Sequence, residues 1–265
     1  MNIPIYQVDA FTIKPFTGNP AAVCLLEHDK NAAWMQAVAT EMNLSETAFL
    51  VPQKDGYHLR WFTPTTEIDL CGHATLASAH ILYEFGFYEE DEQIEFYTLS
   101  GTLTASYREG FIELDMPHRD AVEMSPLTEL DQALGQTPVK TLYYENDLIM
   151  AELVSESAVK SFAPNFELLN KVPYKEIIIT AKTDEGKYDF VSRFFAPRMG
   201  INEDPVTGSA HCILGPYWAK NLNKSEFLAF QASFRTGEVR VRLGDNRVHV
   251  GGKAITVLRG DLLHQ

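Results

Sequence analysis

Two glycines, Gly72 and Gly208, each follow a short polar turn and each open a stretch that is typical of a buried helix. A glycine lets a ligand approach the backbone, and the first N–H groups of a helix have no partner within the helix. Because the helix dipole adds positive potential there, such a start can hold a small anion. His73 and Ser209 directly follow the two glycines. Taken alone, Ser209 is equally consistent with a helix cap, and His73 with a buried structural histidine.

Carboxylates stand near both glycines. Asp204 begins the turn Asp204-Pro205 before Gly208, which is expected to aim its carboxylate back towards the helix start. Glu46 lies between the first expected helix and an apolar strand. A carboxylate at such a junction can be half-buried, and burial raises its pKa towards that of a working base. Both acids are therefore candidates for proton transfer, although each alone is also consistent with an ordinary turn or loop acid.

The two glycines belong to a longer internal repeat. Arg60-Trp61-Phe62-Thr63-Pro64 returns as Arg193-Phe194-Phe195-Ala196-Pro197, with the arginines 133 residues apart in a chain of 265. Each copy leads through a polar turn to a glycine and a helix. Because the match runs through strand, turn and helix together, it predicts two similar halves with the functional residues at matching points and a site between them.

Many short strands and few helices are expected around these residues. The expected helices are Ala32–Met42, which is amphipathic, and the largely apolar His73–Phe85 and Ser209–Lys220. A helix without a polar face must be buried on all sides, so we predict an α+β fold with two pseudo-symmetric halves, each a strand-rich, barrel-like sheet around a central helix. Residues 1–117 plus 253–265 form the predicted N-terminal half and residues 118–252 the C-terminal half. The polar segment Pro117–Pro126 is the predicted linker.

Composition narrows the class of protein. The net charge of −14 argues against binding to nucleic acid or to an anionic membrane surface. The three cysteines (Cys24, Cys71 and Cys212) are odd in number and widely spaced, which fits reduced thiols in a cytoplasmic protein better than a disulfide framework. No apolar run approaches the length of a membrane-spanning helix, and no signal segment is recognisable.

Several motifs, in order along nearly the whole chain, resemble the signatures of the PhzF, or phenazine-biosynthesis-like, isomerase family. They are Asp9-Ala10-Phe11, Phe16-Thr17-Gly18-Asn19-Pro20-Ala21-Ala22-Val23, Ser45-Glu46-Thr47, Phe62-Thr63-Pro64, Cys71-Gly72-His73-Ala74-Thr75, Glu203-Asp204-Pro205-Val206-Thr207-Gly208-Ser209-Ala210 and Gly251-Gly252-Lys253-Ala254. The resemblance implies the diaminopimelate-epimerase-like fold, with the site in the cleft between the halves.

By the same resemblance, Glu46 matches the family's proton-shuttling glutamate, and His73, Asp204 and Ser209 match residues that surround the substrate and assist proton transfer. The resemblance also implies that no cofactor or metal is used. The sequence agrees, since it shows no glycine-rich dinucleotide motif and no tight His/Cys/carboxylate ligand pattern. We therefore expect Glu46, His73 and Asp204 to be catalytic, and Gly72, His73, Asp204, Gly208 and Ser209 to bind the substrate.

One departure bears on the mechanism. Epimerases of this fold place a cysteine before each helix glycine, whereas this chain has Cys71 before Gly72 but Thr207 before Gly208. A threonine hydroxyl is too weak an acid to replace the second thiol without a partner. A cofactor-independent isomerase that moves a proton between carbons of a small carboxylate is thus the leading hypothesis. The alternatives are an epimerase that uses Cys71 and an opposing acid, and a protein of this fold that binds a metabolite without turnover.

The sequence leaves the substrate open. Loops such as Lys14–Thr17 and Arg198–Ile201 are expected to select it. A homodimer is expected, because symmetric dimers are the commonest assemblies and the resemblance points the same way.

Overall fold

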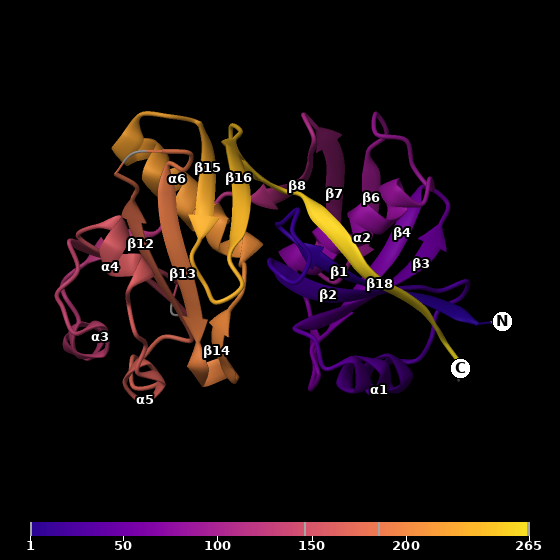
Figure 1. The fold of residues 1–265 in the computed structure, drawn as a ribbon, viewed down its shortest axis with the longest axis horizontal. Coiled ribbons are helices and arrows are strands. Elements are labelled where there is room, and N and C mark those ends of the chain that lie inside the picture. The colour runs from indigo at the N-terminus through magenta and orange to yellow at the C-terminus, as the bar shows by residue number, and fades with distance from the viewer. Residues whose placement is uncertain (1, 146, 185, 264–265) are drawn as a thin grey trace. The chain divides into compact units, whose positions relative to one another are not determined.

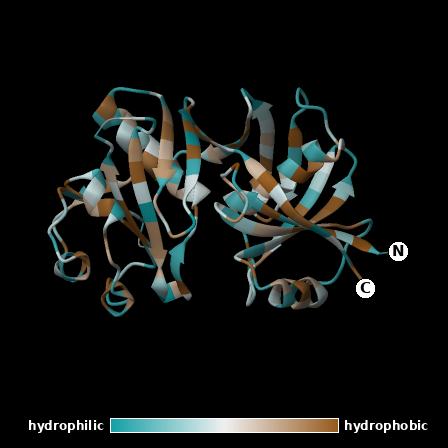
Figure 2. Cartoon of the chain, viewed as in Figure 1, coloured by the Kyte–Doolittle hydropathy of each residue, from teal (hydrophilic) through white to brown (hydrophobic). Residues whose placement is uncertain are grey.

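The fold is α+β, rich in strands with few helices, as the sequence predicts. The computed structural model describes residues 2–145, 147–184 and 186–263 (Figure 1). Its internal contacts divide the chain into two compact units, Met1–Met116 with His249–Gln265, and Pro117–Val248. Hydrophobic residues concentrate in the strands and helices of each unit, while many connecting loops are hydrophilic (Figure 2).

The first unit is built around one buried helix. Its strands are β1 (Ile3–Ala10), β2 (Asn19–Leu25), β3 (Glu46–Gln53), β4 (Gly56–Phe62), β5 (Glu67–Ile68), β6 (Ile94–Thr98), β7 (Gly101–Arg108), β8 (Phe111–Pro117) and β18 (Ala254–Leu262). Helix α2 (Gly72–Glu84) packs against β1, β2, β3 and β18, and helix α1 (Ala32–Met42) covers the other face of the sheet.

Small side chains explain why α2 fits inside the strands. Every residue from Gly72 to Ala79 is buried. The two hydroxyls in this stretch are satisfied within the helix, since Thr75 donates to the carbonyl of Cys71 at 2.5 Å and Ser78 to the carbonyl of Ala74 at 2.7 Å. The prediction of a helix without a polar face is confirmed, with both ends one residue earlier than expected.

The second unit repeats this plan. Its strands are β9 (Val122–Met124), β10 (Lys140–Tyr144), β11 (Leu148–Glu152), β12 (Glu176–Lys182), β13 (Phe190–Ala196), β14 (Ile201–Asp204), β15 (Glu226–Gln231) and β16 (Gly237–Leu243). Its helical segments are α3 (Thr128–Leu134), α4 (Glu156–Lys160), α5 (Phe166–Leu169), the 3₁₀ turns η1 (Pro197–Met199) and η2 (Gly208–Ala210), and the buried helix α6 (His211–Leu222). Strand β17 (Arg247–Gly252) carries the chain from the second unit back into the first.

Strand pairing follows one pattern in both units. In the first unit, β1–β2 is antiparallel, β2–β3 parallel, β3–β4 antiparallel, β4–β5 antiparallel, β4–β6 parallel and β6–β7 antiparallel. The strands β10 to β16 of the second unit give the same series, in the same order. The sequence repeat therefore corresponds to a repeated topology and not only to a repeated motif.

One local expectation is wrong. The second central helix does not begin as a regular α-helix at Ser209, because Gly208–Ala210 forms a 3₁₀ turn and α6 starts at His211. Such tight first turns are common at helix N-termini. The predicted linker Pro117–Pro126 begins where the two units divide, and β9 within it pairs with β10 of the second unit.

Candidate active site

The repeated arginine makes the same ion pair in both units. Arg60 on β4 donates to Glu67 on β5, from Nε to Oε1 at 2.7 Å and from Nη2 to Oε2 at 2.8 Å. Arg193 on β13 donates to Glu203 on β14 with the same atoms, at 2.7 and 3.0 Å. A two-pronged bond of this kind fixes orientation as well as distance. In each unit this ion pair joins the short strand before the helix glycine, β5 or β14, to its neighbour in the sheet, β4 or β13.

The aromatic residue of the repeat has a matching role. The guanidinium of Arg60 lies 5.2 Å from the ring centre of Phe62, and that of Arg193 lies 5.1 Å from the ring centre of Phe195. A cation over an aromatic face is attracted by the ring quadrupole. Sequence reasoning found this repeat but missed the ion pair, whose signal was an acid seven or ten residues after each arginine.

In the first unit, the start of α2 brings three reactive side chains together. Cys71 is the residue before the helix, His73 is in its first turn, and Glu46 is the first residue of β3. Only 8% of Glu46 and 6% of His73 and Cys71 are exposed. Glu46 is thus more deeply buried than the half-buried position expected, because it lies within the sheet beside Ala21 of β2.

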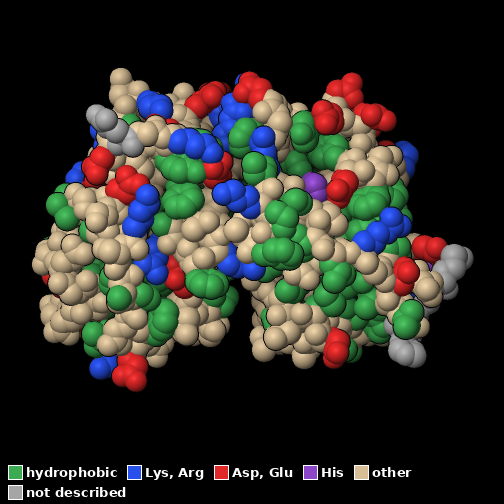
Figure 3. Space-filling view, in the orientation of Figure 1, with side chains coloured by type: hydrophobic (Ala, Val, Ile, Leu, Met, Phe, Trp, Pro, Cys, Tyr) green, Lys and Arg blue, Asp and Glu red, His purple; other side chains and the backbone are tan. Residues whose placement is uncertain are grey.

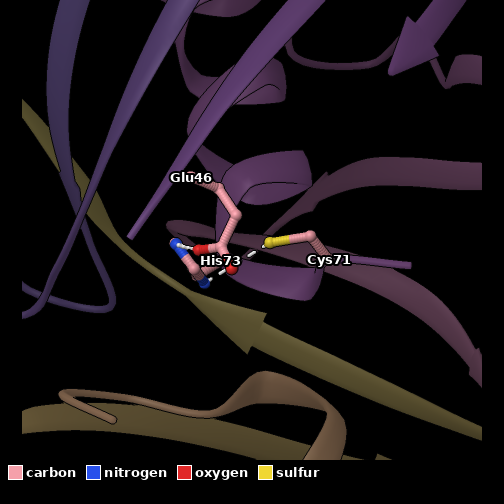
Figure 4. Close-up of side chains that lie close together, drawn as sticks. All are labelled: Glu46, Cys71 and His73. Atoms are coloured by element: carbon pink, nitrogen blue, oxygen red, sulfur yellow. Dashed lines mark hydrogen bonds and ion pairs between the residues drawn. The ribbon is translucent and has the colours of Figure 1, made fainter. Parts of the chain in front are cut away.

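The imidazole of His73 lies between the other two groups (Figure 4). Its Nε2 is 2.9 Å from Oε2 of Glu46, and its Nδ1 is 3.5 Å from Sγ of Cys71. Both ring nitrogens therefore have a partner, and the carboxylate and the thiol share one histidine.

Burial and charge set the protonation of this group. Burial raises the pKa of the Cys71 thiol, and the Glu46 carboxylate raises it further, so the thiol is protonated at neutral pH. Burial lowers the pKa of His73, but Cys71 and Glu46 outweigh it, and that pKa lies well above its usual value. The site thus contains a buried histidine whose two acidic neighbours, Cys71 and Glu46, favour its protonated form.

The same three residues are metal-ligand types. One donor atom from each of Glu46, Cys71 and His73 lies within 4.8 Å of the other two, and the described part of the chain contains no second such group of three. The sequence shows no tight ligand pattern, because Glu46 is far from Cys71 along the chain; the fold brings them together.

In the second unit, the turn before Gly208 is fixed by its own side chains. The Thr207 hydroxyl donates to Oδ2 of Asp204. The carboxylate of Asp204 therefore does turn back towards the helix start. Thr207 stands before Gly208, where epimerases of this fold have their second cysteine. Its hydroxyl already has a partner, because it donates to Asp204.

Two residues that the sequence did not single out for the site hold this turn. Gln231, which is fully buried at the end of β15, accepts from the N–H of Thr207 at 2.8 Å and donates to the carbonyl of Asp204 at 2.9 Å. His211 is also fully buried, and its Nδ1 lies 3.0 Å from the carbonyl of Thr207. Burial lowers the pKa of His211 to about 4, so a neutral ring donates to that carbonyl. These contacts give His211 a structural role in the turn.

The predicted site residues form two groups. Glu46, Gly72 and His73 lie together in the first unit, joined by Cys71. Asp204 and Gly208 lie in the second unit on either side of Thr207, and Ser209 is a partly exposed residue of η2.

Comparison with known proteins shows the fold and the class of enzyme to which the chain belongs. A probable proline racemase from Agrobacterium radiobacter shares the fold, with a TM-score of 0.66 at 12% identity over 99% of this chain and 93% of that chain. A PhzF-family phenazine biosynthesis protein from Enterococcus faecalis superposes with a TM-score of 0.94 at 42% identity, with both chains fully covered. A curated relative from Halalkalibacterium halodurans, an uncharacterized isomerase, is 54% identical over 99% of each chain. The chain is an isomerase with the diaminopimelate-epimerase-like fold.

The family follows from the profile of the phenazine biosynthesis-like proteins, PhzC-PhzF, which matches residues 8–260. This chain belongs to that family. The resemblance read from its motifs is confirmed. Among the described residues, no helix is long and apolar enough to cross a membrane. Acidic and basic side chains are interspersed over the face seen in Figure 3.

Proposed function

We propose that this isomerase works without a cofactor and moves a proton between two carbons of a small carboxylate metabolite, with Glu46 as the group that removes and returns the proton. One observation carries the proposal: a buried carboxylate lies 2.9 Å from Nε2 of a buried, protonated histidine at the start of a central helix. A general base must be shielded from water and held in place, and both conditions are met here.

The proton balance of this step is simple. Glu46 takes a proton from an activated carbon, and the electron pair of the broken C–H bond moves into the substrate as an enolate-like anion. The same carboxyl group then returns the proton to a second carbon. His73 offers a positive charge, and the N–H groups at the start of α2 offer donors, to the charge that develops.

The residues of the second unit are proposed to bind the substrate. The N–H groups of the turn that starts at Gly208 are donors suited to a carboxylate, and Ser209 adds a hydroxyl. Asp204 is proposed to contact an amine or hydroxyl of the substrate, or to set its protonation. The turn held by Gln231 gives these groups a fixed geometry.

An epimerase based on Cys71 is the second candidate. The contact between Sγ of Cys71 and Nδ1 of His73, at 3.5 Å, favours it, since an imidazole can activate a thiol. Two observations weigh against it. Burial holds the pKa of Cys71 above its usual value, and Thr207, at the position of the second thiol, already donates its proton to Asp204.

The decisive experiment compares Glu46→Gln with Cys71→Ala. A thermal-shift screen of small carboxylic acids first supplies a substrate. Glu46→Gln keeps the shape of the side chain but removes the proton acceptor, so turnover should fall by roughly 10²–10⁴-fold with little change in binding. Cys71→Ala should cost much less. In deuterium oxide, the product should carry deuterium at the reprotonated carbon to the extent that the shuttled proton exchanges with solvent.

The opposite ranking would contradict the proposal. If Cys71→Ala abolishes turnover while Glu46→Gln retains it, the epimerase mechanism replaces the single-carboxylate mechanism. A homodimer in the cytoplasm remains part of the proposal, and a monomer mass at micromolar protein would contradict the dimer.

A further inference from the structure

We propose that Glu46, Cys71 and His73 form a binding site for a soft divalent cation, of which Zn²⁺ is the representative, and that its binding blocks the enzyme. The proposed proton transfer gives Cys71 no part, yet the thiol is buried against the two groups that do take part. A thiolate, an imidazole nitrogen and a carboxylate oxygen are the three donors that zinc prefers in proteins.

Distances among the donors suit this ion. Typical bonds from zinc to sulfur, nitrogen and oxygen are about 2.0–2.3 Å long, so two donors around a tetrahedral ion lie roughly 3.3–3.7 Å apart. The Sγ of Cys71 and Nδ1 of His73 are already 3.5 Å apart. All three donors lie within 4.8 Å of one another. Glu46 faces Nε2 of His73 whereas Cys71 faces Nδ1, so binding of one ion requires the Glu46 carboxylate to leave Nε2 and to turn towards the ring nitrogen that Cys71 faces.

Support for the donors comes from different elements. Cys71 lies directly before α2, and the hydroxyl of Thr75 fixes its carbonyl at 2.5 Å. His73 is in the first turn of the helix, and Glu46 is anchored in β3 by its pairing with β2. The donors are thus held on rigid elements rather than on a loop, which is what a metal site requires.

Charge balance also favours such an ion. A thiolate and a carboxylate carry together the two negative charges that Zn²⁺ neutralises, so the occupied site is neutral. The ion enters, and the protons on the thiol and on the imidazole leave to solvent. No uncompensated charge is buried, which is the main cost that a buried metal site must avoid. Three protein ligands leave a fourth position for water, as in open zinc sites.

Inhibition follows because the ion occupies the lone pairs of Glu46 that would accept the substrate proton. This consequence rests on the proposed function of Glu46, whereas binding of the ion does not. If the ion binds but leaves turnover intact, the role of Glu46 is wrong; if the ion fails to bind, that role is untouched.

Binding is tested on the whole chain, stripped of metal with a chelator, by calorimetric titration with Zn²⁺. We expect one ion per chain. Co²⁺ in place of Zn²⁺ should give the near-ultraviolet band of a cobalt–thiolate bond, which reports directly on a cysteine ligand. Cys71→Ser should remove this band and weaken Zn²⁺ binding by roughly tenfold or more, since even loss of a supporting contact to a metal ligand costs about that much.

Cys212→Ser is the matched control, because Cys212 is also a buried free cysteine but lies in α6, outside the group. It should leave both the cobalt band and the affinity for Zn²⁺ unchanged, and circular dichroism checks that each variant is folded. Glu46→Gln, which stays close in shape, should weaken Zn²⁺ binding as Cys71→Ser does. Absence of binding to the wild-type chain, or binding that survives Cys71→Ser with its cobalt band, overturns the proposal.

Discussion

At the scale of single residues, Gln231 shows how the second unit holds its reactive turn. Its buried amide satisfies the N–H of Thr207 and the carbonyl of Asp204. We expect Gln231→Leu, which fills a similar volume without polar atoms, to leave both groups without that partner and to destabilise the chain by about 1–3 kcal/mol. Urea denaturation measures this loss.

Gln93→Leu is the control, because the amide of Gln93 makes one exposed hydrogen bond to Ser106. It should change the free energy of unfolding by less than about 0.5 kcal/mol. Equal effects of the two substitutions would mean that the amide of Gln231 does not fix the turn.

The sequence predicts which residues belong to the site better than it predicts which side chains they contact. Cys71, Gly72 and His73 are neighbours, and the glycine marks the helix start, so their proximity could be predicted. Glu46 was named as a base, but nothing in the chain around it gives its distance to His73, which depends on how β3 pairs with β2. Gln231 could not have been found, since a buried glutamine at the end of a strand has no local signature.

At the scale of elements, the repeated arginine allows a comparison within one molecule. Arg193 and Glu203 have side chains 8% and 15% exposed, whereas Arg60 and Glu67 are 17% and 25% exposed. Arg193 also donates to the carbonyl of Phe162 at 2.5 Å, a second contact that holds its guanidinium inside the protein.

We therefore expect Glu203→Gln to destabilise the chain by about 3 kcal/mol, because it leaves a buried guanidinium without its counter-charge. Glu67→Gln should cost only about 1 kcal/mol, since water screens the more exposed pair. Thermal unfolding of the two variants under one set of conditions gives the ranking. A larger loss for Glu67→Gln would show that burial does not decide the strength of these pairs.

The starts of the two central helices show what a hydrophobic sequence pattern does not predict. The apolar run after Gly72 predicted a buried helix, and the structure has one. The run after Gly208 looks alike, but its first turn is a 3₁₀ turn, and the residue before it, Thr207, donates to Asp204 and offers its carbonyl to His211. Hydrophobic pattern predicts that a helix exists, whereas its first turn depends on bonds from side chains around it.

At the scale of the whole molecule, one topology occurs twice while the chemistry differs between the copies. Helix α2 begins beside a thiol, an imidazolium and a carboxylate, and the second copy begins beside a threonine that donates to an aspartate. The repeat could be predicted because it is written in the sequence as Arg-x-Phe-x-Pro. The different chemistry of the two copies could not be predicted, because it depends on which side chains the fold buries together and which of them carry charge.

The stability of the whole molecule should depend on pH through His211. Its pKa is about 4 in the folded chain, against about 6.5 when unfolded, so between these values the unfolded chain binds the proton and the folded chain does not. Stability is therefore retained above pH 6.5 and lost as the pH falls, by about 1.4 kcal/mol per pH unit and roughly 3 kcal/mol in total. His73 contributes a slope of opposite sign only near pH 6.5, where the unfolded chain begins to lose its proton and the folded chain does not, and this contribution is the same in the wild type and in a His211 variant.

His211→Asn isolates this effect, because its amide can still donate to the carbonyl of Thr207 but does not titrate. The variant should be less stable near pH 7, since the smaller side chain leaves a cavity. Between pH 6.5 and 4, however, its free energy of unfolding should fall less steeply than that of the wild type, and carboxylates titrate alike in both chains. Urea denaturation at half-unit steps of pH measures the two slopes. Parallel slopes would mean that His211 accepts a proton in the folded chain as readily as in the unfolded one, so that its burial beside Thr207 does not keep it neutral.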